Sequence, residues 1–287
     1  MSVRLVITDV MWDRIEPLMR SDPVRGRRWA DHRRTLEAIA WKYRTCSPWR
    51  DLPEELGPFQ IAHKRLIRWA VDGTWERILA AVLAVADADD DVGWTVSVDS
   101  TVCRAHQHSA GARKRGRPGR FEPKDHALGR SRGGLSTKVH LASDSQARPL
   151  SIHITAGQAG DAPAFEAVME GIWVPRRGHG RPRTRPAIVL ADRAYSSRAI
   201  RGHLRRRGVR SVIPQPADQI GHRMRRGRAG GRPPGFDAEA YKQRNSVERC
   251  INRLKQWRGL AMRTDKLALA YQAALHLAAI FMWTGPD

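Results

Sequence analysis

The chain has 287 residues and a formal net charge of +22, because 51 lysines and arginines outnumber 29 acidic residues. This length fits one large domain or a small domain joined to a medium one, and so strong a positive charge favours a polyanionic partner, for which we expect nucleic acid. Ten tryptophans and 41% hydrophobic residues exclude a purely basic tail, since this composition supports a folded core.

Residues 1–88 are expected to form an N-terminal all-α domain. Thr8 or Asp9 caps a first amphipathic segment. Residues 59–71 and 75–87 predict two helices joined by a short turn that contains glycine, which is a helix-turn-helix-like signal. A small helical bundle with a basic face explains the same pattern. The candidate DNA contacts on the first of these two helices are His63, Lys64, Arg65 and Arg68.

The acidic run at residues 86–91 is expected to mark a domain boundary, and residues 93–287 differ in character. The order of three strands, helix, strand, helix, strand and helix predicts a mixed α/β sheet flanked by helices. Asp161 is expected to cap the helix that follows the third strand. The strands are expected near residues 93–100, 136–143, 148–157, 186–192 and 209–214, with the second and third forming a hairpin around Asp144-Ser145.

Three segments rich in arginine, glycine and proline interrupt this pattern, at residues 103–135, 176–186 and 215–235. Each contains too much glycine, proline and charge to pack, so we expect exposed loops that contact DNA phosphates without sequence preference. Candidate DNA contacts in the first of them are Arg117, Arg130 and Arg132.

Residues 236–259 predict one long helix, with Asp237 as its N-cap and Gly259 at its C-terminal cap. At about 100° per residue, four polar residues share an arc of roughly 60°, while an apolar arc is free to pack on a sheet. The polar arc holds Tyr241, Arg244, Glu248 and Lys255, and the apolar arc holds Val247, Cys250, Ile251, Leu254 and Trp257. One carboxylate beside two cations suits a metal held next to a polyanion. A solvated helix face with an incidental Glu–Arg pair is the alternative.

Two features of composition bear on location. The three cysteines, Cys46, Cys103 and Cys250, are far apart and lack CxxC spacing, so we expect a reducing cytoplasm and no disulfide framework. Residues 267–283 are the only membrane candidate, but the segment is short and contains Gln272 and His276. We expect a buried packing helix there, and no membrane partner.

The acidic residues that end two apolar strands predict a metal site. Asp99 and Asp192 each stand at the carboxyl end of a strand, where ligands bind in open α/β sheets. If the strands are parallel neighbours, the two carboxylates converge, and the long helix can deliver Glu248 as a third. Oxygen ligands match Mg²⁺ or Mn²⁺, and a pair of such ions supports in-line phosphoryl displacement. A turn or helix cap is the other explanation of a single strand-end aspartate.

These residues resemble the signature of a known family. Asp99-Ser100-Thr101, Asp192 within LADRAYSS, and the spacing Tyr241-x₂-Arg244-x₃-Glu248-x₆-Lys255 are similar to the DDE transposases of bacterial insertion sequences, above all the insertion-sequence-five family and its insertion-sequence-four relatives. The resemblance covers nearly the whole chain. The stretches SPWRDLP, DGTWERIL, GRSRGGLSTKVHL and AGQAGDAPAFE extend it.

The resemblance implies a ribonuclease-H-like fold with Asp99, Asp192 and Glu248 as catalytic ligands of two Mg²⁺ ions, for which Mn²⁺ can substitute. It implies recognition of terminal inverted repeats, strand cleavage that leaves a 3′-hydroxyl, and transfer of that hydroxyl to target DNA. Arg244 and Lys255 would hold DNA phosphates near the cut, while Tyr241 would position the strand or the helix. Arg193, directly after Asp192, is a further candidate DNA contact. The N-terminal helices would read the element ends, and pairing two ends would require a homodimer or higher oligomer in the nucleoid.

Two other classes of protein compete with this interpretation. A catalytically silent, transposase-derived regulator would bind DNA with strong salt dependence but would break no strand. A basic RNA-binding or ribosome-associated protein would leave the three acidic residues unexplained.

Overall fold

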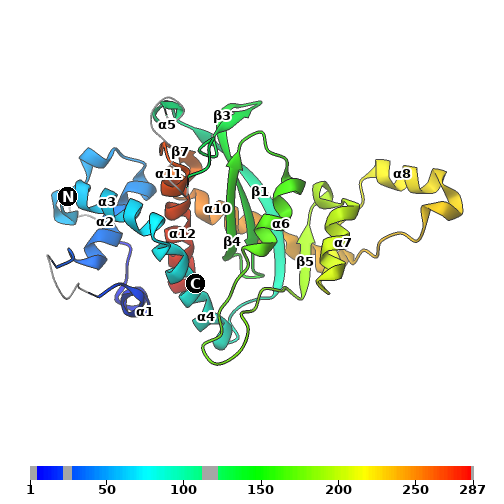
Figure 1. Cartoon of the computed structure of the whole chain (residues 1–287), viewed down its shortest axis with the longest axis horizontal. Coiled ribbons are helices and arrows are strands. Elements are labelled where there is room, and N and C mark those ends of the chain that lie inside the picture. The colour runs from blue at the N-terminus through cyan, green and yellow to red at the C-terminus, as the bar shows by residue number, and fades with distance from the viewer. Residues whose placement is uncertain (1–4, 22–27, 112–121, 286–287) are drawn as a thin grey trace.

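The computed structural model describes residues 5–21, 28–111 and 122–285. Its N-terminal part is helical, as the sequence predicts, and Figure 1 shows it in blue and cyan. The four main helices are α1 (Asp9–Ile15), α2 (His32–Thr45), α3 (Phe59–Val71) and α4 (Thr74–Ala88). Thr8 caps α1 by accepting a hydrogen bond from the Met11 amide.

A short turn joins α3 and α4, as the sequence predicts. Gly73 takes a left-handed conformation with φ of 72°, which glycine adopts without steric cost. The carboxylate of Asp72 accepts hydrogen bonds from the amide and the hydroxyl of Thr74. The Trp75 indole then donates to the Leu66 carbonyl, so the second helix is tied back to the first.

A seven-stranded mixed sheet forms the centre of the molecule. Its strands are β1 (Thr95–Ala105), β2 (Gly129–Ser131), β3 (Gly134–Ser143), β4 (Pro149–Ala156), β5 (Ile188–Ala191), β6 (Arg210–Val212) and β7 (Met262–Arg263). β3 runs antiparallel to β1 on one side and to β2 and β4 on the other, while β5 and β7 lie parallel to β1. β6 lies parallel to β5 at the far edge. The expected mixed sheet flanked by helices and its hairpin are confirmed.

Helices cover both faces of this sheet. In Figure 1, α6 (Asp161–Glu170) lies in front of the strands and α10 (Asn245–Lys255) crosses behind them. α6 contacts β3 and β4, and α10 contacts β1 and β3. α7 (Arg198–Arg206) packs beside β6. Buried apolar side chains of β1, β3, β5 and these helices fill the space between the layers.

The last helix, α12 (Ala268–Thr284), joins the two parts of the chain. It packs against α3 and α4 on one side and against β4 on the other, and nearly all of its residues are buried. A helix that is apolar around its whole circumference has to be enclosed in this way. The prediction of a packing helix is confirmed. No helix within the described residues is long and apolar enough to cross a membrane.

Strand β1 is longer than the sequence predicts. Asp99 does not end it, because β3 pairs with β1 without interruption from Ser97 to Arg104. The segment 103–135 is therefore not one exposed loop. It begins inside β1, contains α5 (Gln107–Ala110) and β2, and buries Glu122 and His126.

The other two segments that were expected to be exposed loops also carry structure. Arg176 and Arg183 bond the buried carboxylate of Asp87, which fastens the segment 176–186 to the end of α4. The segment 215–235 contains α8 (Ala217–Arg225), which buries none of its side chains. Figure 1 shows this segment as an arm that extends away from the body of the protein.

The long helix predicted for residues 236–259 is divided. It consists of α9 (Ala238–Tyr241), a 3₁₀ turn over Lys242–Arg244 and α10, which ends at Lys255. Asp237 caps α9 as predicted. The prediction for Gly259 is wrong, because this residue lies inside α11 (Arg258–Ala261), where a Cβ atom would lie 2.9 Å from the carbonyl oxygen of Tyr43.

Candidate active site

The candidate site lies at a gap in the sheet beside the middle of β1. β5 pairs with β1 from Thr95 to Val98, and β7 pairs with it only from Arg104. Among the described residues, the intervening part of β1 has no strand on that side. Val98 stands opposite Ala191 in parallel register, so Asp99 and Asp192 are the next residues of two neighbouring strands. The two strands are therefore parallel neighbours, which is the condition on which the predicted convergence of their carboxylates depends.

Alternation along β1 directs one set of side chains toward α10. Ser246 donates a hydrogen bond to the hydroxyl of Ser97 over 2.9 Å, which anchors the start of the helix. Further along, the ammonium group of Lys255 donates to the hydroxyl of Thr101 over 2.6 Å. The apolar side of α10 packs on the sheet between these contacts, with Val247 and Cys250 fully buried. The helix is therefore held in a fixed position along β1.

Arg244 links the acidic residues of the strand and of the helix. Its Nη2 lies 2.5 Å from Asp99 Oδ2, and its Nη1 lies 2.6 Å from Glu248 Oε1. Glu248 is thus connected to Asp99 by the guanidinium group that both carboxylates contact. In the part of the chain that the structure describes, no cluster of three or more His, Cys, Asp or Glu side chains is tight enough to hold a metal ion.

The donor atoms nevertheless have the chemistry of a site for a hard cation. Asp99 Oδ1 accepts the Ser100 amide over 2.8 Å, and Asp192 Oδ1 accepts the Ala194 amide over 2.8 Å. These bonds orient both carboxylates from the backbone. Carboxylate oxygens are the ligands that Mg²⁺ and Mn²⁺ prefer, so the residue types fit such an ion.

The electrostatics of Asp99 reflect this crowding. Burial raises the pKa of its carboxyl group, and the nearby charges of Asp192 and Asp161 raise it further. The Ser100 amide and Arg244 oppose the rise without cancelling it. Acidic groups that repel one another in this way favour a bound cation.

Asp161 is a residue of the site that the sequence interpretation missed. It does not cap α6, since Gly160 occupies that position. Its Oδ1 instead accepts hydrogen bonds from the Ser100 hydroxyl at 2.6 Å and from Lys138 Nζ at 3.0 Å. Burial alone would raise the pKa of Asp161, but these two donors lower it below its usual value. Its place at the start of a helix gave no signal of this contact, which depends on the pairing of β1 with β3.

The predicted DNA contacts fall into several places. Tyr241 is half-buried, and its ring lies 5.2 Å from that of Phe236. Arg193 is exposed directly after Asp192, and Arg130 and Arg132 are exposed around the β2–β3 turn. Arg117 lies outside the described residues. On α3, the exposed candidates are His63, Lys64 and Arg68.

Arg65 is a correction to the predicted basic face of α3. Only 6% of this residue is exposed. Its guanidinium lies 4.1 Å from the ring centre of Trp29 and 4.9 Å from that of Trp69, and its Nη1 lies 3.0 Å from His32 Nδ1. Burial lowers its pKa. Its chief role is cation–π packing inside the helical part, because it faces inward from α3.

Comparison with known proteins agrees with this geometry. Residues 91–283 match the family described as "Transposase DDE domain", and residues 7–79 match "Putative transposase of IS4/5 family". The "Putative transposase for insertion sequence element IS6501" of Brucella ovis is 30% identical over 149 residues, which cover 52% of this chain and 98% of that protein. "Uncharacterized protein y4sN" of Sinorhizobium fredii is 38% identical over 110 residues, or 38% of this chain and 83% of that protein.

Among solved structures, the Mos1 strand transfer complex aligns with 92% of this chain and 79% of its own at 14% identity. Its TM-score of 0.25 is too low to bear on the fold. The family matches cover both the helical part and the sheet that carries Asp99, Asp192 and Glu248. The chain therefore belongs to the DDE transposases of the IS4/5 family of insertion sequences.

Proposed function

We propose that this transposase binds the terminal inverted repeats of its insertion sequence, cleaves the DNA strand there and joins the freed 3′-hydroxyl to target DNA. The observation that carries the proposal is the parallel register of β1 and β5, which brings Asp99 beside Asp192 and next to the helix of Glu248. The repeated step is an in-line attack on a phosphodiester, and it needs no covalent intermediate with the protein.

Asp99, Asp192 and Glu248 would hold the divalent ions, with Mg²⁺ as the expected metal and Mn²⁺ as its substitute. When bound, two such ions activate the attacking oxygen and stabilise the leaving one. The backbone amides of Ser100 and Ala194 orient two of the carboxylates. Arg244 pairs with Asp99 and Glu248 and offsets part of their charge, and its fork of donors also suits a phosphate oxygen.

Basic and aromatic side chains around the acids would hold the DNA. Lys255 lies at the end of α10 nearest Thr101, so its ammonium group can meet a phosphate beside β1. Tyr241 would position the strand or the helix. The exposed cations of α3 would contact the element ends, and two copies of the chain would be needed to pair them.

The acid residues provide the first test. Asp99→Asn, Asp192→Asn and Glu248→Gln should each lower Mg²⁺-dependent nicking of an oligonucleotide that carries the element end by at least about a thousandfold, because each removes a charged metal ligand. Binding of the same oligonucleotide should persist. Glu239→Gln is the matched control, since this exposed carboxylate pairs only with Lys242 among the described residues.

Nicking that survives in Glu248→Gln would refute the assignment of the third acid. Wild-type protein that binds the ends tightly but breaks no strand in Mg²⁺ or Mn²⁺ would instead be a silent regulator. Sedimentation of the wild-type protein with end DNA measures how many chains the complex contains.

A further inference from the structure

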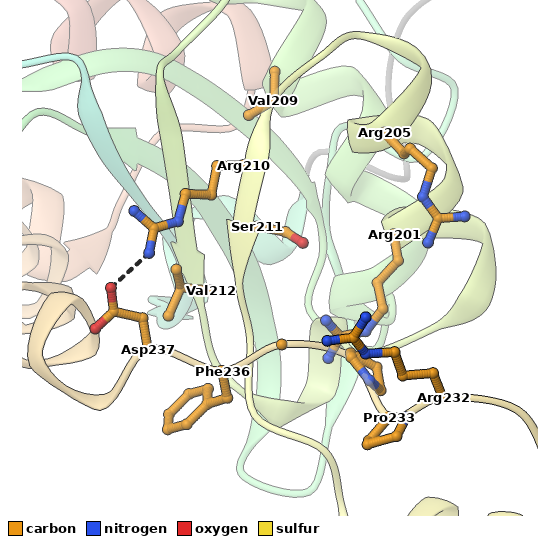
Figure 2. Close-up of a pocket in the computed structure, with 12 residues that line it drawn as sticks. Arg201, Arg205, Val209, Arg210, Ser211, Val212, Arg232, Pro233, Phe236 and Asp237 are labelled. Carbon is orange, nitrogen blue, oxygen red and sulfur yellow. Dashed lines mark hydrogen bonds and ion pairs between the residues drawn. The ribbon is translucent and has the colours of Figure 1, made fainter.

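A basic groove lies along the free edge of the sheet, away from the acidic residues. It has a volume of about 850 Å³ and lies between α7, the edge strand β6 and the segment that returns from the arm to α9. Figure 2 shows its side chains projecting from these three elements. The arginines that line it are Arg201, Arg205, Arg210 and Arg232, and the acidic residue is Asp237.

The charges of this groove are only partly balanced by the protein. Arg210 bonds Asp237 over 2.6 Å, which uses the one carboxylate that lines the groove. Within the described residues, the side chains of Arg205 and Arg232 have no hydrogen-bond or ion-pair partner, and Arg205 is exposed. Two guanidinium groups are therefore free to bind an anion.

Arg201 supports the wall of the groove. Its Nη2 donates to the Ile213 carbonyl at 2.7 Å and to the Ser196 hydroxyl at 2.9 Å. These contacts hold the side chain between α7 and the end of β6. Its Nε is buried and has no partner among the described residues. Its positive charge thus has no carboxylate partner in the part of the chain that the structure describes.

One ring contact and one strand pairing connect the groove to the elements of the candidate active site. Asp237 caps α9, which ends at Tyr241, and the ring of Phe236 lies 5.2 Å from the ring of Tyr241. β6 is paired to β5, whose next residue is Asp192. A polyanion that crosses the acidic residues can therefore extend along the sheet edge into the groove.

We propose that this groove binds the sugar–phosphate backbone of duplex DNA next to the segment that lies in the active site. The inference rests on the proposed function, and it adds a second, sequence-independent anchoring surface. Guanidinium groups bind phosphate oxygens through paired hydrogen bonds, and the lining offers no base-reading pattern. The free cations, Arg205 and Arg232, carry most of the contact.

Salt dependence of DNA binding tests the proposal. The full chain with Arg205→Ala and Arg232→Ala is compared with wild type for binding to a fluorescent duplex that lacks the inverted repeat, between 50 and 200 mM salt. Each phosphate contact contributes about 0.9 to the slope of log affinity against log salt, so the slope should fall by nearly 2. Melting temperatures verify that the variant is folded.

The matched control carries Arg206→Ala and Arg258→Ala, two exposed arginines of α7 and α11 that do not line the groove. This control should change the slope by less than about 0.5, because it removes the same charge away from the contact. Equal changes in both double variants would overturn the proposal, as would an unchanged slope in the groove variant. A groove variant that loses binding to poly-glutamate but keeps its DNA slope would point to an acidic protein and would also overturn it.

The two proposals fail in different ways. The binding assay uses no metal and no element end, so it reports on the groove even if the protein cuts nothing. Loss of end nicking in wild type, together with a lowered slope in the groove variant, would refute the proposed reaction alone. Normal nicking with an unchanged slope would refute the groove alone.

Discussion

At the residue scale, the site is built from contacts on the two faces of β1. Asp99 and Thr101 point toward α10, where Asp99 meets Arg244 directly before the helix and Thr101 meets Lys255 at its end. Ser100 points to the opposite face and donates to Asp161. Because side chains alternate between the two faces of a strand, Asp99 faces α10 while the next residue, Ser100, bonds Asp161 on the other face. Asp161 thus holds β1 from behind, at the position next to Asp99.

Replacement of Asp161 by asparagine tests this support. The change keeps the shape but removes the charge that holds Ser100 and Lys138, so we expect end nicking to slow by about 10- to 100-fold. Affinity for the end oligonucleotide should stay within about twofold of wild type. Glu170→Gln, at the exposed far end of α6, is the control. Unchanged nicking in Asp161→Asn would show that the contact has no part in the reaction.

At the scale of elements, α12 is the helix that packs against both the N-terminal helices and the sheet. It carries His276 into an apolar setting, where Nδ1 has no hydrogen-bond partner among the described residues and lies 3.5 Å from Glu76 Oε1. Burial lowers the pKa of His276 to about 4, so the folded protein keeps this ring neutral. In the unfolded chain the same ring takes up a proton near its usual pKa of about 6.5.

Acid should therefore destabilise the protein through His276. As the pH falls from 7 to 5, the unfolded state gains a proton that the folded state excludes, which removes about 2 kcal/mol from the free energy of unfolding. Between pH 7 and 5, the free energy of unfolding of His276→Leu should therefore fall by about 2 kcal/mol less than that of the wild-type protein. Urea denaturation at the two pH values measures the difference. Replacement of the exposed His179 should leave the pH dependence as it is. An identical pH response of His276→Leu and wild type would contradict the assignment.

The sequence predicts the elements whose pattern is local. The hairpin at Asp144 and the α3–α4 turn at Gly73 follow from turn chemistry and periodicity. The length of β1 does not, because pairing with β3 carries the strand past Asp99. Arg65 and Asp161 were misread for a similar reason: their partners, Trp29 and Ser100, lie far away in the sequence. α8 was missed because its arginines and glycines are typical of loops.

At the scale of the whole molecule, the helical part and the sheet share one core. The helical part includes α3 and α4, and both pack on α12, which also packs on β4. The domain boundary expected at residues 86–91 stays a prediction from the sequence. The packing favours one cooperative folding unit, since neither part can cover α12 without the other.

A fragment of residues 93–287 tests this cooperation. Without α3 and α4, one side of α12 faces water, so we expect the fragment to melt at least about 10 °C below the full chain or to aggregate. Calorimetry of the full chain should show a single transition. Two separate transitions, or a fragment as stable as the full chain, would show that the parts fold independently.

The position of α12 in the chain also sets an order of events during synthesis. The ribosome produces α1 to α4 long before it produces the helix that completes their packing. Until α12 emerges, these helices remain without one of their walls, and so does the outer side of β4. A frameshift or an early stop anywhere between β6 and α12 would therefore leave α3, α4 and β4 without the helix that covers them. We expect a protein without α12 to be as inactive as a protein without the acidic residues.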